Sequence, residues 1–397
     1  MRRVESVLFV TTSHPRFKGD FAGVFVQRLA KYLVRNGLRV TVLAPASPGY
    51  PTIDEIDGVQ IQRFSYFHPK RLQRLAYGEG GGIVGNLRNS WLAKVQLPFL
   101  MAAMTLTIAR HQSRFDLVHC HWLPTAGAAL LARYLSRHKR PIVLTNWGSD
   151  TRNSPSFVTR SVVSRVEGCI SPSVETENHL RAAGRRSFVR IWALADEETF
   201  DRDRVNAGLP VELGLEPNVP IFLFVGRLDS IKDPLTFIRA CAHLRDRGLR
   251  FYALVLGDGP LMAACRDETA ACQLAHYVRV LGMRPDPERA YRVGCLSVHV
   301  SPIENVWAGT IVEAMQMGVP VVLSDAGLTS QFFGHEKNCL IVPSREPEEL
   351  AQAMERLLNS PSLRQRLSNG GFDLLAAHDR NSSKAVSQVR NYYDSLL

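Results

Sequence analysis

Two positively charged residues, a glycine and a helix-opening proline lie close together in the C-terminal half of the sequence. Gly226 ends an apolar run, Arg227 and Lys232 follow it five residues apart, and Pro234 can open a helix. Arginine offers paired N–H donors to a phosphate, and lysine offers a compact charge. If the apolar run is a strand of a parallel sheet, both would stand at its carboxyl edge and could bind an anion. On spacing alone, a solvated loop with surface charges explains the pattern equally well.

Residues 301–320 combine carboxylates with small residues at the start of a predicted helix. Glu304 lies in a loop after an apolar run, and Glu313 lies about one turn into a helix that ends at Gly318. Small residues at a helix N-terminus let backbone N–H groups approach an anion. A carboxylate there can accept hydrogen bonds from hydroxyl groups of a ligand. The alternative for a lone Glu313 is a surface charge that complements the helix dipole.

Short apolar runs alternate with helical spacing along the chain, and they predict the elements that would hold these residues. The runs are 7–11, 39–43, 117–119, 142–145, 168–171, 221–225, 252–256, 278–281, 296–300, 319–323 and 340–342. Such alternation is typical of α/β proteins with parallel, doubly wound sheets. We predict two domains, residues 1–195 and 221–378, joined by a hinge at 196–220. Residues 379–397 read as a final helix that could pack back on the first domain.

Positive charge is concentrated in the first half of the chain. Residues 1–195 contain 27 Lys and Arg and 11 Asp and Glu, a net charge of +16, whereas residues 196–397 contain 21 and 26, a net charge of −5. This asymmetry suggests a membrane surface or another anionic partner, although a basic surface without a partner gives the same count. The apolar stretch 91–108 is interrupted by Lys94, Gln96 and Pro98, so we expect a buried helix rather than a membrane segment.

The motifs, taken in order, resemble those of the retaining glycosyltransferases of family 4, which have the GT-B fold of two Rossmann-like domains facing a cleft. In the second half they are Gly226-Arg227-x4-Lys232, the strand and turn at 254–260, Gly282 and the block 304–313. In the first half they are 11–15, 19–23, 116–122 and 170–173. The resemblance implies an enzyme that moves a sugar from a nucleotide-diphosphate sugar to a lipid-linked or saccharide acceptor, with retention of configuration. It implies no metal or other cofactor and no nucleic-acid partner.

The resemblance also assigns roles to individual residues. Arg227 and Lys232 would hold the donor diphosphate, Glu313 the ribose, and Glu304 the hydroxyls of the donor sugar. Gly23 would approach the distal phosphate, and His121 would contact the sugar. The rest of the donor pocket would be formed by Gly282, Met283, Trp307, Ala308, Gly309, Thr310 and Ile311.

Two departures from the family pattern leave alternatives open. Eight residues separate Glu304 from Glu313 where the family often has seven, so Asn305 is the alternative contact to the sugar. Residues 146–150 read Asn-Trp-Gly-Ser-Asp where members commonly have His-Gly-x-Asp. Asn146, Trp147 and Asp150 are therefore our candidates for the acceptor side.

Arg63, Lys70, Arg71 and Arg74, near Tyr66 and Phe67, form a candidate basic-aromatic patch. With the charge asymmetry, this patch suggests a cytoplasmic protein attached peripherally to an anionic membrane.

Other readings remain at this stage. His119 and His121 would share a face of one strand, but the sequence offers no third metal ligand. A metal-dependent transferase would need a D-x-D motif after a strand of its nucleotide-binding domain, whereas Asp201-Arg202-Asp203 lies in the predicted hinge. Gly257-x-Gly259 is too short for the glycine motif that binds dinucleotides. The same fold also hosts nucleotide-sugar epimerases, and the basic half could belong to a non-catalytic module that binds a membrane or polyanion.

Overall fold

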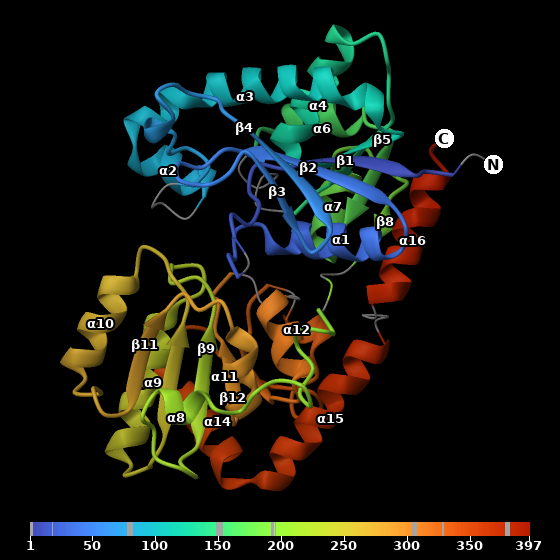
Figure 1. Ribbon diagram of the computed structural model, residues 1–397. Coiled ribbons are helices and arrows are strands. Elements are labelled where there is room, and N and C mark those ends of the chain that lie inside the picture. Colours follow the sequence, from blue (N-terminus) through green and yellow to red (C-terminus); the bar gives the residue numbers. More distant parts are fainter. Residues whose placement is uncertain are drawn as a thin grey trace. The chain divides into compact units, whose positions relative to one another are not determined.

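The computed structural model of the chain contains two compact units, each built around one β-sheet (Figure 1). It describes residues 3–17, 19–77, 82–147, 154–191, 194, 196–303, 308–327, 329–377 and 382–397. Unit 1 comprises Met1–Leu194 together with Ser382–Leu397, and unit 2 comprises Ala195–Asn381.

Unit 1 is organised around an eight-stranded sheet with the order β3-β4-β2-β1-β5-β6-β7-β8. Every neighbouring pair is parallel except β3 and β4, which form an antiparallel hairpin. The strands are β1 (Ser6–Val10), β2 (Arg39–Pro45), β3 (Ile53–Ile56), β4 (Val59–Phe64), β5 (Leu117–His121), β6 (Ile142–Thr145), β7 (Gly168–Ser171) and β8 (Val189–Arg190).

Helices cover both faces of this sheet, because alternate residues of its strands are apolar and buried on each side. One face packs mainly against α3 and α4, and the other packs against α1 and the C-terminal helix α16. The helices are α1 (Val24–Arg35), α2 (Ile83–Asn89), α3 (Trp91–His111), α4 (Leu123–Leu135), α6 (Ser156–Val163), α7 (Val174–Ala182) and α16 (Ser382–Asp394), with 3₁₀ turns at Lys70–Leu72 and Gln112–Arg114.

Unit 2 contains a six-stranded, wholly parallel sheet with the order β11-β10-β9-β12-β13-β14. Its strands are β9 (Ile221–Val225), β10 (Tyr252–Leu256), β11 (Val278–Gly282), β12 (Leu296–His299), β13 (Val321–Ser324) and β14 (Leu340–Val342). Its helices are α8 (Leu209–Glu212), α9 (Pro234–Asp246), α10 (Met262–Ala271), α11 (Pro287–Val293), α12 (Gly309–Gln316), α13 (Thr329–Phe332), α14 (Pro347–Asn359) and α15 (Pro361–Ala377). The predicted fold class, two Rossmann-like α/β domains with parallel sheets, is confirmed.

The segment predicted as a hinge packs on unit 2 along much of its length. The ring of Phe200 lies edge-on to Tyr291 with centroids 5.9 Å apart, and Arg202 donates to the carbonyl of Met317 at 2.7 Å. Glu212 in α8 pairs with Arg284 and Arg289. Residues 196–220 therefore belong to a folded unit rather than forming a free linker.

Helix α3 differs from the prediction of a buried helix. Only a third of its most apolar 18-residue window is buried, and by length and composition it is the one helix of the described chain that could cross a membrane. Leu100, Met104 and Ile108 face the core, whereas Trp91, Val95 and Leu106 are exposed. Composition does not reveal this division, because apolar residues occupy both faces.

The prediction of a basic-aromatic patch around β4 is also wrong in part. The Arg63 guanidinium is buried, donates to the carbonyl of Pro15 at 2.9 Å and pairs with Asp54 at 3.2 Å. Tyr66 is buried as well, and its hydroxyl accepts a hydrogen bond from the Leu75 N–H at 3.1 Å. Arg63 therefore fastens a loop, while Lys70, Arg71 and Arg74 remain at the surface.

Candidate functional site

Arg227 and Lys232 both lie beyond the carboxyl end of β9, as predicted. The Asp229 carboxylate organises the turn between them, accepting hydrogen bonds from the backbone N–H groups of Ile231 and Lys232 at 3.1 and 3.0 Å. Its other oxygen lies 2.8 Å from the Arg227 guanidinium, which remains 39% exposed. A guanidinium carries five N–H donors, so this pairing leaves donors for a ligand. Asp233 then caps α9 by accepting from Thr236.

Two glycines of the next strand end let this turn pack closely. A Cβ atom on Gly257 would lie 1.7 Å from the carbonyl oxygen of Gly226, and one on Gly259 would lie 2.5 Å from that of Leu228. The backbones are joined by hydrogen bonds, including Leu228 N–H to Asp258 O at 2.9 Å. The Gly257-x-Gly259 motif therefore supports the backbone that carries Arg227.

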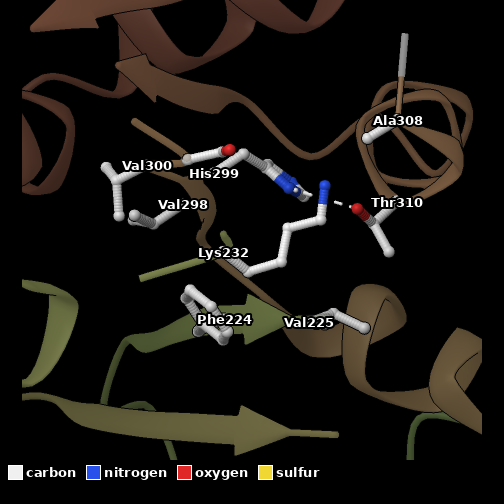
Figure 2. Close-up of a pocket in the computed structure, with 9 residues that line it drawn as sticks. Phe224, Val225, Lys232, Val298, His299, Val300, Ala308 and Thr310 are labelled. Atoms are coloured by element: carbon white, nitrogen blue, oxygen red, sulfur yellow. Dashed lines mark hydrogen bonds between the residues drawn. The ribbon is translucent and has the colours of Figure 1, made fainter. Parts of the chain in front are cut away.

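Lys232 lines a pocket with residues from β12 and from the start of α12. The pocket is bounded by Phe224, Val225, Lys232, Val298, His299, Val300, Ser301, Ala308 and Thr310. Figure 2 shows the Lys232 side chain extending past the apolar wall toward Thr310 and His299. Three residues predicted for the donor pocket, Lys232, Ala308 and Thr310, are thus brought together.

His299 is a site residue that sequence reasoning missed. Its Nε2 lies 3.0 Å from the Ser297 hydroxyl and its Nδ1 lies 3.3 Å from the Thr310 hydroxyl (Figure 2). Burial, with a smaller effect from the positive charge of Lys232, lowers the pKa of His299 to about 3. The ring is therefore neutral near pH 7, and one nitrogen donates while the other accepts. The available signal was a titratable residue at the end of a short strand, just before the predicted loop.

Helix α12 carries three more of the predicted donor-binding residues. Glu313 on its second turn and Ile311 are both buried, and Gly309 is its first residue. The hydroxyl of Tyr291 donates to the Thr310 carbonyl at 3.2 Å and so fixes the start of the helix. A hydroxyl-binding role for a buried carboxylate fits this position.

The remaining predicted residues of unit 2 fall into two groups. Gly282 ends β11 with a φ of 74°, and its carbonyl accepts the N–H of Gly257 at 2.9 Å, while Met283 is partly exposed after it. Glu304, Asn305 and Trp307 lie outside the described residues, as does Asp150 of unit 1.

Gly23 forms the N-cap of α1 in a tightly packed loop of unit 1. Its φ is 63°, and a Cβ there would lie 2.2 Å from the carbonyl oxygen of Ser13, so only glycine fits. The loop is fastened by a bidentate contact between Arg16 and the buried Asp20 carboxylate, at 2.6 and 3.2 Å. In the first turn of α1 the Val24 N–H donates to the Phe21 carbonyl at 3.3 Å, and the N–H groups of Val26 and Gln27 donate to the Gly23 carbonyl at 2.9 and 3.3 Å. The predicted approach of Gly23 to the distal phosphate stays a prediction.

His121 ends β5 and is held by aromatic neighbours. Trp147 Nε1 donates to His121 Nδ1 at 3.3 Å, which places the ring proton of the neutral histidine on Nε2. Burial lowers the pKa of His121 well below its usual range, and His119 and His14 lower it further. Among the described atoms, the buried Nε2 finds no hydrogen-bond partner. It is a donor available to a ligand oxygen.

The backbone next to His121 is strained. Trp122 has a φ of 74°, which a large side chain rarely adopts and which costs on the order of 1–3 kcal/mol. The Trp122 N–H donates to the Thr145 carbonyl at 3.1 Å. Such strain is found where a chain must direct a particular side chain.

His119 has a structural role instead of the metal-binding role weighed above. Its Nε2 lies 2.6 Å from the Thr145 hydroxyl and its Nδ1 lies 2.6 Å from the hydroxyl of Tyr393 in α16. Both ring nitrogens are thus engaged.

Asn146, on the predicted acceptor side, is buried directly after the end of β6. No group of three or more potential metal ligands occurs among the described residues.

Comparison with known proteins gives two family matches and a consistent fold. Residues 219–360 match the family described as glycosyl transferases group 1, and residues 22–193 match glycosyltransferase family 4. A D-inositol 3-phosphate glycosyltransferase of Nocardia farcinica is 25% identical over 90% of this chain and 81% of its own. A 2-deoxystreptamine glucosyltransferase of Streptomyces kanamyceticus is 27% identical over 85% and 90%.

Solved structures with less than 25% identity share the fold. The sucrose-phosphate synthase of Thermosynechococcus elongatus has a TM-score of 0.78 at 18% identity, covering 99% of both chains. Anabaena Alr3699/HepE in complex with UDP-glucose has a TM-score of 0.72 at 18% identity, covering 97% of this chain and 98% of that one.

Proposed function

Because the chain belongs to the family 4, group 1 glycosyltransferases, which makes it a transferase with the GT-B fold, we propose that it moves a sugar from a nucleotide-diphosphate sugar to a lipid-linked or saccharide acceptor, with retention of the anomeric configuration. The observation that carries this proposal is the position of Arg227 and Lys232 beyond β9, with Lys232 facing the start of α12. Neither an isolated surface charge nor a structural ion pair requires that arrangement.

The residues support a leaving-group mechanism. When the bond between the anomeric carbon and the phosphate oxygen breaks, the nucleoside diphosphate gains negative charge that Arg227 and Lys232 stabilise. The acceptor hydroxyl forms the new bond on the same face of the sugar, and its proton passes to the departing phosphate. Glu313 holds the ribose, and the Nε2–H of His121 donates to a donor-sugar oxygen. We include no protein base and no metal in this scheme.

The direct test is donor cleavage by variants of the cation pair. With UDP-glucose as the first probe, we expect Arg227→Ala or Lys232→Ala to lower the rate of UDP release by about 10²–10³-fold, the usual effect of losing one transition-state donor. The matched control is Arg250→Ala, which removes an exposed guanidinium of unit 2 that pairs with Glu216. Full activity of Arg227→Ala with UDP-, GDP-, ADP- and dTDP-sugars alike would refute the site.

Metal independence is tested separately. We expect the same initial rate before and after dialysis against EDTA, since the two cations take the place of a divalent ion at the diphosphate. A loss of activity that Mg²⁺ or Mn²⁺ restores would contradict this. Appearance of an epimerised nucleotide sugar without acceptor would favour the epimerase reading.

The proposed location is the cytoplasm, on the cytoplasmic face of a membrane, where a lipid-linked acceptor would be found. The net charge of +16 on residues 1–195 supports this, because basic surfaces are attracted to anionic lipids.

A further inference from the structure

Helix α3 lies on the outside of unit 1 (Figure 1), and several of its large apolar side chains are exposed. Trp91 is 75% exposed, and Val95, Phe99 and Leu106 are each between 44% and 51% exposed. With about 100° per residue, these four side chains fall within a quarter of the helix circumference. We call them the α3 stripe. Large apolar side chains aligned in this way mark a surface that binds something.

The opposite face of α3 is anchored in the fold, which fixes how the stripe is presented. Leu100, Met104 and Ile108 are fully or almost fully buried in the core. Buried Gln96 donates to the Leu72 carbonyl at 2.5 Å and accepts from the Leu75 N–H at 3.2 Å. Crossing a bilayer would break these contacts and leave polar groups without partners. The helix therefore lies along unit 1 with its stripe facing outward.

The neighbouring helix α4 also exposes apolar side chains. Helix α4 packs beside α3 and exposes Leu131, Tyr134 and Leu135 near its C-terminal end. The exposed residues Arg137, His138 and Lys139 follow directly. Apolar and aromatic side chains next to cations are typical of a membrane interface.

The charge of this region selects one kind of partner. Residues 80–166 contain eleven Lys and Arg but only two acidic residues, Asp116 and Asp150. The Asp116 carboxylate already accepts hydrogen bonds from the N–H groups of Glu5 and Ser6 at 3.1 and 3.0 Å. A second copy of the chain would place like charges against each other, whereas an anionic lipid surface would complement them.

We propose that the α3 stripe inserts into the headgroup region of an anionic bilayer, with α3 lying parallel to the membrane plane and the flanking cations contacting lipid phosphates. This inference names the surface that would meet the membrane, and it rests on the membrane location given under the proposed function. It does not depend on the sugar transferred or on the cation pair of unit 2.

Flotation of the whole protein with vesicles tests the proposal. The vesicles contain either phosphatidylcholine alone or phosphatidylcholine with phosphatidylglycerol, at low and high salt. We expect binding to the anionic vesicles at low salt, weakened by salt. The variant Trp91→Ser/Val95→Ser/Leu106→Ser should bind about tenfold less or weaker still. The matched control Ile53→Ser/Val211→Ser, which removes two exposed apolar side chains elsewhere, should bind like the wild type.

Two further measurements keep the outcomes distinct. Brominated phosphatidylglycerol should quench wild-type tryptophan fluorescence more than that of Trp91→Phe, because Trp91 would lie within the headgroup region. UDP-glucose cleavage in the absence of vesicles should be unchanged in the stripe variant, so a failure of the donor site shows itself separately. The proposal is overturned if the wild type does not bind anionic vesicles, if the stripe variant floats like the wild type, or if the stripe instead drives dimerisation in vesicle-free solution.

Discussion

The tautomer of His121 is set by Trp147, a residue 26 positions further along the chain that stands where family members commonly have histidine. The indole can only donate, so the hydrogen bond to Nδ1 fixes the proton of the neutral ring on Nε2. The departure from the family pattern thus has a physical consequence, because the tryptophan orients a donor instead of supplying a titratable group. The sequence predicted His121 and Trp147 as separate site residues, and only the fold joins them.

Replacing Trp147 by phenylalanine tests this role. The change keeps an aromatic ring against Phe25, which lies 4.2 Å away between centroids, but removes the N–H donor. We expect kcat/KM for donor cleavage to fall by about tenfold, the effect of losing one hydrogen bond of roughly 1–1.5 kcal/mol. The thermal midpoint should change little. An unchanged kcat/KM would show that Trp147 does not control the tautomer.

His299 shows what residue patterns cannot supply. Its partners, the hydroxyls of Ser297 and Thr310, come from its own strand and from a helix that begins ten residues later. The resemblance assigned Lys232 and Thr310 to the donor pocket, and in the structure both line one pocket. It did not identify the neutral His299 beside them, since a polar residue in a buried strand is usually structural.

At the scale of elements, periodicity predicted the parallel strands well and the connections less well. The hairpin of β3 and β4 was missed, although Asp57 and Gly58 both have positive φ, at 52° and 78°, and an Asp-Gly pair is a common signal for such a turn. The exposed stripe of α3 was missed because its apolar residues surround the helix. Which of them meet the core depends on α4 and on Gln96, which no local pattern reveals.

The C-terminal helix α16 contacts β5, the strand of unit 1 that ends at His121. Val386 and Val389 are buried against α1 and the sheet, and Tyr393 bonds to His119, whose ring lies 4.3 Å from that of His121. The grouping of residues 382–397 with unit 1 follows from this packing. The sequence predicted the helix itself, but it did not determine whether the helix packs on the first domain.

We expect Tyr393→Phe to destabilise unit 1 by about 1–3 kcal/mol, because the buried His119 Nδ1 loses its partner. Urea unfolding followed by circular dichroism measures this change. Ser387→Ala, on the exposed face of the same helix, is the control and should leave stability unchanged. Equal midpoints for both variants would mean that the hydroxyl adds nothing to the packing of the ring.

For the whole molecule, the buried histidines predict how stability depends on pH. Burial lowers the pKa of His119 to about 3, and burial with the charge of Arg63 lowers that of His14 to about 4, both in unit 1. His299 is the corresponding group in unit 2. The unfolded chain binds protons at these rings below about pH 6.5, whereas the folded chain does not. Stability must therefore fall as pH falls from 6.5 toward 4.

Calorimetry between pH 8 and 4.5 measures this dependence. Each such histidine contributes a loss of about 1.4 kcal/mol per pH unit below 6.5, so the unit 1 transition should shift more steeply than that of unit 2. His138→Gln, at an exposed position, should leave both slopes unchanged. A unit 1 transition that keeps its midpoint from pH 7 to 4.5 would contradict the prediction.

The grouping of residues 382–397 with unit 1 also determines the order in which the protein can be completed on the ribosome. Unit 2 is a continuous stretch of chain that lies between the two parts of unit 1. Synthesis proceeds from the N-terminus, so unit 2 is fully translated before Val386, Val389 and Tyr393 emerge. Until then the sheet face of unit 1 that these residues cover is open to water or to other nascent chains. Synthesis of unit 1 therefore begins first, but its core is covered last.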